Sequence, residues 1–315
     1  MSKASSEPAD GAALASSPQE SALVLLDAAL SCLVATRCGP GSYGPAMRAN
    51  VRASLLLLIG LVAKPAIAPA AGSAEPMAIS VQQASTHPMR YHLALPSGWS
   101  ADRPWPVLVV IPDAGREFEA NLTRFVSARG DRPYILVAPE VLSCGGAGSR
   151  TANHYSYAPA VWDSLVSGDD FAFEDGGLKA VLADVHRRWQ GEPQAFLTGW
   201  EAGGHTVWAQ ALRHPERWRG VAPVTTNYQR RGLDSTAFSK APERASLPIQ
   251  PFRCGAPTGD MAQAMTFLEQ QTALAMRDAR DHGFHPLPVQ VVPGADHGPL
   301  PEAVLAWCDS LRRRG

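Results

Sequence analysis

Residues 191–224 have the sequence GEPQAFLTGWEAGGHTVWAQALRHPERWRGVAPV and decide the fold of this chain. The apolar run Ala195–Leu197 favours a buried strand. Gly199 and Gly203 bracket a tight turn, and residues 202–213 then show the apolar spacing of a helix. Glycine permits both the turn and the close approach of a helix to a strand. The stretch therefore predicts a strand, a sharp turn and a helix, in that order.

The turn matches the pattern Gly-x-Ser-x-Gly except at its middle position. In that pattern a tight strand-to-helix turn lifts a nucleophilic serine out of the sheet. Here residues 199–203 are Gly-Trp-Glu-Ala-Gly, so Glu201 occupies the position of the nucleophile. The sequence thus predicts the scaffold of a nucleophile elbow with a carboxylate in place of the serine hydroxyl.

Length and composition indicate one globular domain with additional sequence. The chain has 315 residues, of which 45% are hydrophobic, and its net charge is -1. The balanced charge offers no basic stripe for nucleic acid, and no P-loop motif is present. No cofactor and no metal site are predicted, because no cysteine pair has C-x-x-C spacing and no His-x-x-x-His pair occurs. The five cysteines are Cys32, Cys38, Cys144, Cys254 and Cys308.

The first 74 residues have the composition of a leader followed by an export signal. Residues 1–46 are of low complexity and rich in Ala, Ser, Pro and Gly. Residues 47–74 have a basic start, an apolar core at Ala53–Ala63 and a small-residue end, which is the pattern of a secretory signal peptide. The core is shorter than the ~20 residues that a membrane-spanning helix needs. No stable membrane anchor is therefore predicted.

We expect translation to start at Met47, so that residues 1–46 are not translated, and cleavage to follow Ala70 or Ala74. The protein would then be secreted or periplasmic, and only the last three cysteines would remain in the mature chain. Three thiols allow at most one intrachain disulfide. The alternative is an apolar leader on a cytoplasmic protein.

Residues 76–315 alternate between strand-like and helix-like segments. Such alternation predicts a mostly parallel sheet that helices cover on both faces. The predicted strands are 78–83, 89–95, 106–111, 134–138, the elbow strand, 220–224, 248–254 and 289–292. The predicted helices are 118–128, 178–189, 202–213, 261–282 and 301–313.

Three motifs carry a family resemblance: LTGWEAGGHTVW at 197–208, HPERWRGVAPV at 214–224 and VVPGADHG at 291–298. With the order of elements, they resemble the α/β-hydrolase fold, and more narrowly the secreted polyhydroxybutyrate-depolymerase and feruloyl-esterase group. The resemblance covers about residues 89–313. It implies an eight-stranded α/β sheet, and a small-molecule, polyester or carbohydrate-ester ligand. Members of this group have serine where this chain has Glu201.

The resemblance also implies the partners of the missing serine. In this fold a histidine takes the proton of the nucleophile and an acid orients the histidine, in the chain order nucleophile, acid, histidine. His297 follows the last predicted strand and matches the histidine, and Asp260 matches the acid. The alternatives are a surface-loop histidine and an N-cap for the helix beginning at Met261. Asp296 is a second candidate acid, although its position beside His297 in the sequence favours another direction.

An oxyanion hole needs backbone N–H groups that point at the developing negative charge. We expect one from Ala202, directly after the elbow residue, and one from the loop at Asp113 and Ala114. A carboxylate that pointed inward would repel the oxyanion. We therefore expect the Asp113 side chain to point outward.

Aromatic residues near the elbow are the candidate ligand-binding residues. Trp200 is adjacent to the elbow residue, while Tyr155, Tyr157 and Trp162 belong to the long connection 141–170. Loops over the carboxyl ends of parallel strands form binding sites. These rings would suit a sugar or a phenolic ring, and a self-packed loop is the alternative.

Three roles for Glu201 compete. First, the site is inactive: a carboxylate attacking an ester would give a reactive anhydride, and a glutamate at a helix N-terminus is stabilised there. Second, the carboxylate attacks an alkyl carbon and forms an ester intermediate, as aspartate does in some enzymes of this fold. Third, Glu201 and His297 act as general bases on water. We favour the first role, with an active hydrolase of atypical chemistry as the alternative.

Overall fold

The computed structural model describes residues 78–144, 155, 157–166, 170–228, 233, 235–255 and 261–314. The predicted leader (1–46) and signal peptide (47–74) lie outside these residues. Within the described ranges, no helix combines the length and the apolar character needed to cross a bilayer.

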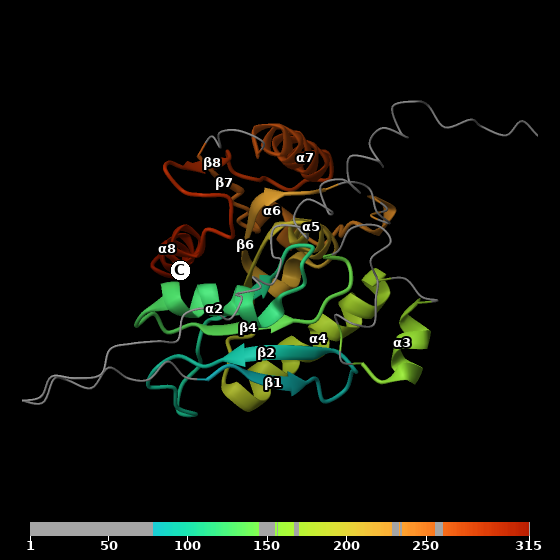
Figure 1. Cartoon of the computed structure of the whole chain (residues 1–315), viewed down its shortest axis with the longest axis vertical. Helices are drawn as coiled ribbons and strands as arrows, with labels where there is room; N and C mark the ends of the chain where they lie inside the picture. Colours follow the sequence, from blue (N-terminus) through green and yellow to red (C-terminus); the bar gives the residue numbers. More distant parts are fainter. Residues whose placement is uncertain are drawn as a thin grey trace, which may run out of the picture. The chain divides into compact units, whose positions relative to one another are not determined.

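A single eight-stranded sheet forms the centre of the described domain (Figure 1). Its order is β1-β2-β4-β3-β5-β6-β7-β8. Strand β2 runs antiparallel to both of its neighbours, and all other pairings are parallel. The strands are β1 (Ser80–Gln83), β2 (Arg90–Ala94), β3 (Val107–Ile111), β4 (Ile135–Pro139), β5 (Ala195–Glu201), β6 (Trp218–Thr226), β7 (Phe252–Cys254) and β8 (Gln290–Val292). The predicted mostly parallel, eight-stranded sheet is confirmed.

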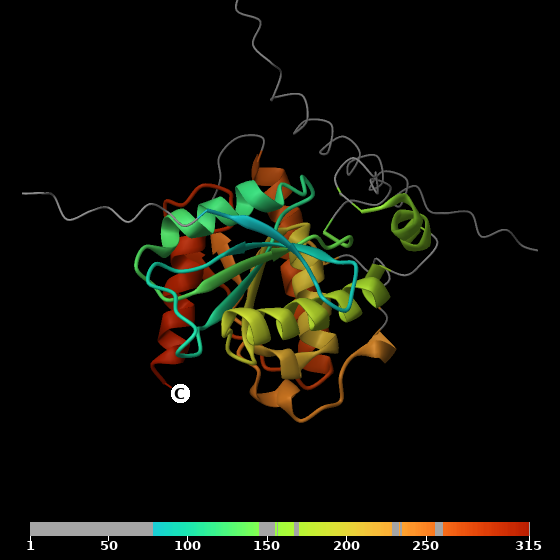
Figure 2. The same cartoon turned by 90° about the horizontal axis from the view of Figure 1, so that it is seen from below.

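Helices cover both faces of this sheet. Every residue of β3 and β4 is buried, as expected for strands that are covered on both sides. Figure 2 shows α2 and α8 on one face and α4 and α5 on the other. The helices are α2 (Phe118–Arg129), α3 (Pro159–Val166), α4 (Asp170–Trp189), α5 (Gly203–Arg213), α6 (Glu243–Ser246), α7 (Met261–Asp281) and α8 (Pro301–Arg312), with 3-10 turns η2 (Pro215–Arg217) and η3 (Ser235–Ala237).

Helix α4 is longer than its apolar spacing predicts, because it begins at Asp170 rather than at residue 178. Two glycines, Gly176 and Gly177, lie in the part that the sequence pattern missed, and glycine weakens a helix interior. A Cβ atom on Gly177 would lie 2.5 Å from the Cε atom of Met89. The glycines therefore allow α4 to pack closely on the segment before β2.

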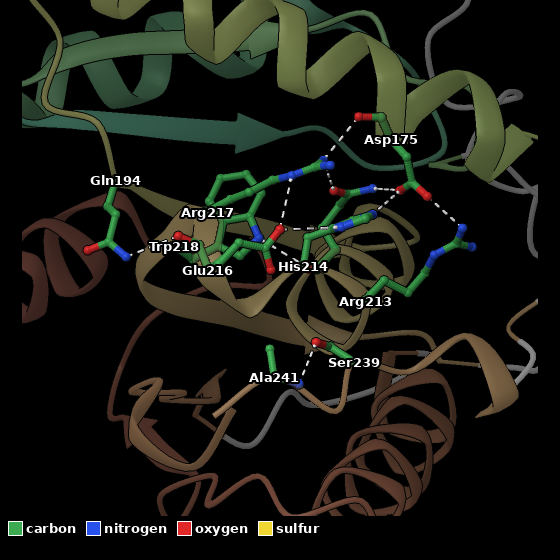
Figure 3. Close-up of polar contacts among 10 residues, drawn as sticks. Asp175, Gln194, Arg213, His214, Glu216, Arg217, Trp218, Ser239 and Ala241 are labelled. Carbon is green, nitrogen blue, oxygen red and sulfur yellow. Dashed lines mark hydrogen bonds and ion pairs between the residues drawn. The ribbon is translucent and has the colours of Figure 1, made fainter. Parts of the chain in front are cut away.

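Asp175 ties α4 to the C-terminal end of α5, the helix that follows the elbow (Figure 3). Its carboxylate lies 2.5 Å from Nη2 of Arg213 and 2.9 Å from Nε2 of His214, and it accepts a hydrogen bond from Gln210 at 2.9 Å. Arg217 donates to its backbone carbonyl at 3.0 Å. Burial by itself would raise the pKa of Asp175, but the contacts with His214, Gln210 and Arg213 hold that pKa below its ordinary value. The HPERW motif thus supplies part of the network that positions α5.

We expect Asp175→Asn to lower the free energy of unfolding at pH 7 by about 2 kcal/mol, because it removes hydrogen bonds to a charged group. A carboxyl group with a lowered pKa stabilises the fold above its unfolded pKa and loses that effect as pH falls through its folded pKa. The difference in the free energy of unfolding between the wild type and the variant should therefore become smaller below about pH 4. Urea denaturation across a pH series measures it, with the exposed Asp131→Asn as the matched control. A difference that stays constant down to low pH would contradict this role.

Candidate active site

Glu201 lies at the strand-to-helix turn between β5 and α5. It is the last residue of β5, and α5 begins at Gly203 after the N-cap residue Ala202. Its φ of 51° is in the left-handed region, which a non-glycine residue rarely adopts. The amide of Asn227, just beyond β6, donates to the Glu201 carbonyl at 2.8 Å and helps to hold this conformation. The backbone therefore has the strained turn that the elbow pattern predicts.

The glycines around Glu201 are required by close packing. A Cβ atom on Gly203 would lie 2.0 Å from the carbonyl oxygen of Pro112, and one on Gly204 would lie 2.2 Å from Cγ2 of Thr226. A Cβ atom on Gly199 would lie 2.8 Å from Cγ2 of Val207. The start of α5 is thus pressed against the loop after β3 and the end of β6, which sets the position of the Glu201 side chain.

The structure brings Glu201 and His297 together. The Oε1 atom of Glu201 lies 3.9 Å from Nε2 of His297, an ion-pair distance that is longer than a hydrogen bond. The two side chains are 30% and 16% exposed, so the pair is only partly screened from water. The rings of Trp200 and His297 pack edge to face with centroids 5.2 Å apart. Neither ring nitrogen of His297 has a hydrogen-bond partner among the described residues.

Of the two candidate acids, Asp296 lies within the described residues. Asp260 lies outside the described residues, so its predicted role stays a prediction. Asp296, adjacent to the histidine in the sequence, is exposed.

Asp113 and Ala114 lie in the loop after β3, and both are half-buried. The Oδ1 atom of Asp113 accepts a hydrogen bond from the amide of Gly115 at 3.2 Å. Burial, and after it the negative charge of Glu201, raise the pKa of Asp113. A second carboxyl group therefore lies within electrostatic reach of Glu201, on the loop that we expect to supply an oxyanion-hole donor.

Arg116 holds this loop and was not singled out from the sequence. Its side chain is buried, its Nε donates to the Tyr155 hydroxyl at 2.8 Å, and its Nη1 donates to the Ala114 carbonyl at 3.3 Å. The Tyr155 hydroxyl in turn donates to the Val141 carbonyl at 2.9 Å. Arg116 has a φ of 54°, which no local sequence signal indicates. The guanidinium links the loop after β3 to the connection after β4.

The three aromatic residues of that connection pack on one another. The Tyr155 ring stacks on those of Tyr157 and Trp162, with centroids 5.8 Å and 5.6 Å away. Tyr155 is only 7% exposed, and the Tyr157 hydroxyl donates to the Glu140 carbonyl at 2.9 Å. These three rings have the arrangement of a self-packed cluster. Of the predicted ligand-binding aromatic residues, Trp200 lies beside the Glu201–His297 pair.

The sequence matches no protein-family model, and no curated protein matches it. Solved structures do resemble this chain. A poly(aspartic acid) hydrolase-1 from Sphingomonas sp. KT-1 has a TM-score of 0.53 at 14% identity, covering 75% of this chain and 98% of that one. An S-formylglutathione hydrolase from Agrobacterium tumefaciens has a TM-score of 0.50 at 13% identity, covering 75% and 95%. A poly(3-hydroxybutyrate) depolymerase from Bordetella parapertussis has a TM-score of 0.48 at 18% identity, covering 76% and 91%.

The likenesses to the first two of these structures, at TM-scores of 0.53 and 0.50, concern the fold. The chain has the α/β-hydrolase fold, as the sequence motifs predict.

Proposed function

We propose that this α/β-hydrolase-fold protein has lost ester hydrolysis or retains it only weakly, and that it holds a small-molecule, polyester or carbohydrate-ester ligand. The observation that carries the proposal is the position of Glu201 at the strained elbow, with its carboxylate facing His297 at 3.9 Å. A carboxylate in that place cannot form the stable acyl-enzyme that a serine forms. It also leaves the histidine without a hydroxyl to deprotonate.

The charge around the elbow supports the same proposal. Ester hydrolysis develops a negative oxyanion, and the fold stabilises it with hydrogen-bond donors placed in advance. Here Glu201 puts a carboxylate at the start of α5, and Asp113 places a second carboxyl group on the neighbouring loop. Negative charge at both positions opposes the oxyanion instead of stabilising it.

The proposed location is outside the cytoplasm. This proposal depends on the signal-peptide pattern of residues 47–74. N-terminal sequencing of the protein from its native host tests it, and a cytoplasmic chain that retains those residues would contradict it.

Turnover of p-nitrophenyl acetate and butyrate by the purified full chain tests the loss of hydrolysis. We expect the wild-type rate to match that of a heat-denatured sample, because the carboxylate of residue 201 cannot form a stable acyl-enzyme. Glu201→Gln, which keeps the size of the side chain and removes its charge, is the matched control. Saturable turnover that Glu201→Gln abolishes would overturn the proposal and would show a catalytic carboxylate.

A further inference from the structure

Strand β8 forms one edge of the sheet, next to β7 and α7 (Figure 1). It pairs with β7 alone. The amide of Gln290 donates to the Pro251 carbonyl at 2.8 Å, so Gln290 directs its backbone groups towards β7. Because successive residues of a strand direct these groups to opposite edges, Val289 and Val291 direct theirs away from the sheet. Neither valine amide has a backbone partner among the residues that the structure describes.

The same edge exposes apolar side chains. In the described part of the chain, the exposed large apolar side chains are Val81, Leu287 and Val291, at 43%, 42% and 41%. Leu287 and Val291 both belong to the segment that runs into and along β8. Val289 lies on the same face of the strand as Val291 and lines a cavity of about 230 Å³ between β7 and α7. An edge strand with exposed apolar side chains favours pairing with another strand.

Residues 286–295 lack the charges that usually protect an edge strand. Their sequence is PLPVQVVPGA. Natural edge strands often carry lysine or another charged residue, which prevents pairing with a second chain. Pro288 and Pro293 have no amide donor and confine any added pairing to residues 289–292. On the neighbouring elements Arg253 pairs with Glu269, so the charges beside this edge balance each other.

We propose that β8 pairs with β8 of a second copy of this chain, in an antiparallel register with two-fold symmetry centred on Gln290. The free backbone groups lie symmetrically about Gln290, at residues 289 and 291, so the edge is complementary to itself. Residue 289 of each copy faces residue 291 of the other, and the two residues exchange both of their backbone hydrogen bonds. The facing valines cover each other's apolar surface beside the cavity. This pairing involves neither Glu201 nor His297, so it is independent of the proposed function.

Sedimentation velocity of the full chain over a concentration series tests the pairing. We expect the mass to rise with concentration from 33.5 kDa towards twice that value. Val291→Lys should weaken association at least about tenfold, because it replaces two apolar cross-strand contacts with charge on the paired edge. Val81→Lys is the matched control, since Val81 is equally exposed on β1 at the opposite edge, and it should associate as the wild type does. Circular dichroism checks that both variants are folded.

A disulfide test reports the register. In the proposed pairing Gln290 faces its own copy in a non-hydrogen-bonded pair, where the two Cα atoms lie about 4.5 Å apart. That separation is within the range that a disulfide spans. The Gln290→Cys variant should therefore form an intermolecular disulfide under mild oxidation, which peptide mapping locates at residue 290. The Val81→Cys variant should form none at residue 81.

Four results would each overturn the proposal. The first is a wild type that stays monomeric throughout the series, and the second is a Val291→Lys variant that associates as the wild type does. The third is association that Val81→Lys weakens as much as Val291→Lys. The fourth is a dimeric Gln290→Cys variant that forms no disulfide at residue 290.

Discussion

The Glu201→Ser variant is expected to hydrolyse p-nitrophenyl butyrate about a hundredfold to a thousandfold faster than the wild type. Removing one member of a working triad costs several powers of ten, so restoring the missing member should recover part of that rate. His297 already lies at the elbow, and the strained turn at residue 201 would present the new hydroxyl to it. Initial rates at several substrate concentrations measure the gain.

Two further variants test how His297 and Asp113 contribute to this rate. Adding His297→Gln to Glu201→Ser should return the rate to the wild-type level, because the base would be lost. Adding Asp113→Asn should raise the rate further, because it removes negative charge near the developing oxyanion. A folded Glu201→Ser variant that is inactive on a broad ester panel would show that more of the site than its nucleophile is missing.

The Gly203→Ala variant is expected to lose about 3 kcal/mol or more of its free energy of unfolding. The new Cβ atom would meet the Pro112 carbonyl oxygen at 2.0 Å, and because that atom belongs to the backbone, α5 or the loop after β3 would have to move. Urea denaturation measures the loss. Gly298→Ala is the matched control, since nothing lies within 4 Å of its Cβ position, and it should change stability by less than about 0.5 kcal/mol.

Equal stability of the two variants would contradict the close approach of α5 to this loop. The contact matters for the site as well as for the fold, because it fixes where residue 201 points. A Gly203→Ala/Glu201→Ser double variant that folds but lacks esterase activity would show this dependence directly.

The central strands and the elbow could be predicted because the residues that form each of them are contiguous in the sequence. The apolar run of β3 and the glycines around Glu201 are local signals, and the structure places both where the pattern indicates. Helix α3, by contrast, lies in the connection 141–170, for which no regular element was predicted. The start of α4 was missed because its glycines serve a contact with Met89, a residue far away in the sequence.

The features of the candidate site likewise fall into two groups: those that a local sequence pattern predicts and those that depend on tertiary packing. Glu201 was nominated by the local elbow pattern, and His297 by its place after the last strand together with the family resemblance. The electrostatic contact of Asp113 with Glu201 depends on how closely α5 approaches the loop after β3, and the link from Arg116 to Tyr155 joins two segments of the chain. Such features follow from tertiary register, which no local pattern encodes.

The three cysteines of the domain can report how often the folded structure opens around each of them. Cys144, Cys254 and Cys308 are free and buried, and they lie after β4, in β7 and in α8. Burial raises the pKa of Cys144 to about 12 and raises those of Cys254 and Cys308 as well, so all three are protonated and shielded. An alkylating reagent can reach them only when the structure around each one opens, and the labelling rates compare local opening at three separate places. In an oxidising compartment the same burial protects a finished molecule, which confines the risk of thiol cross-linking to the interval before the chain has folded.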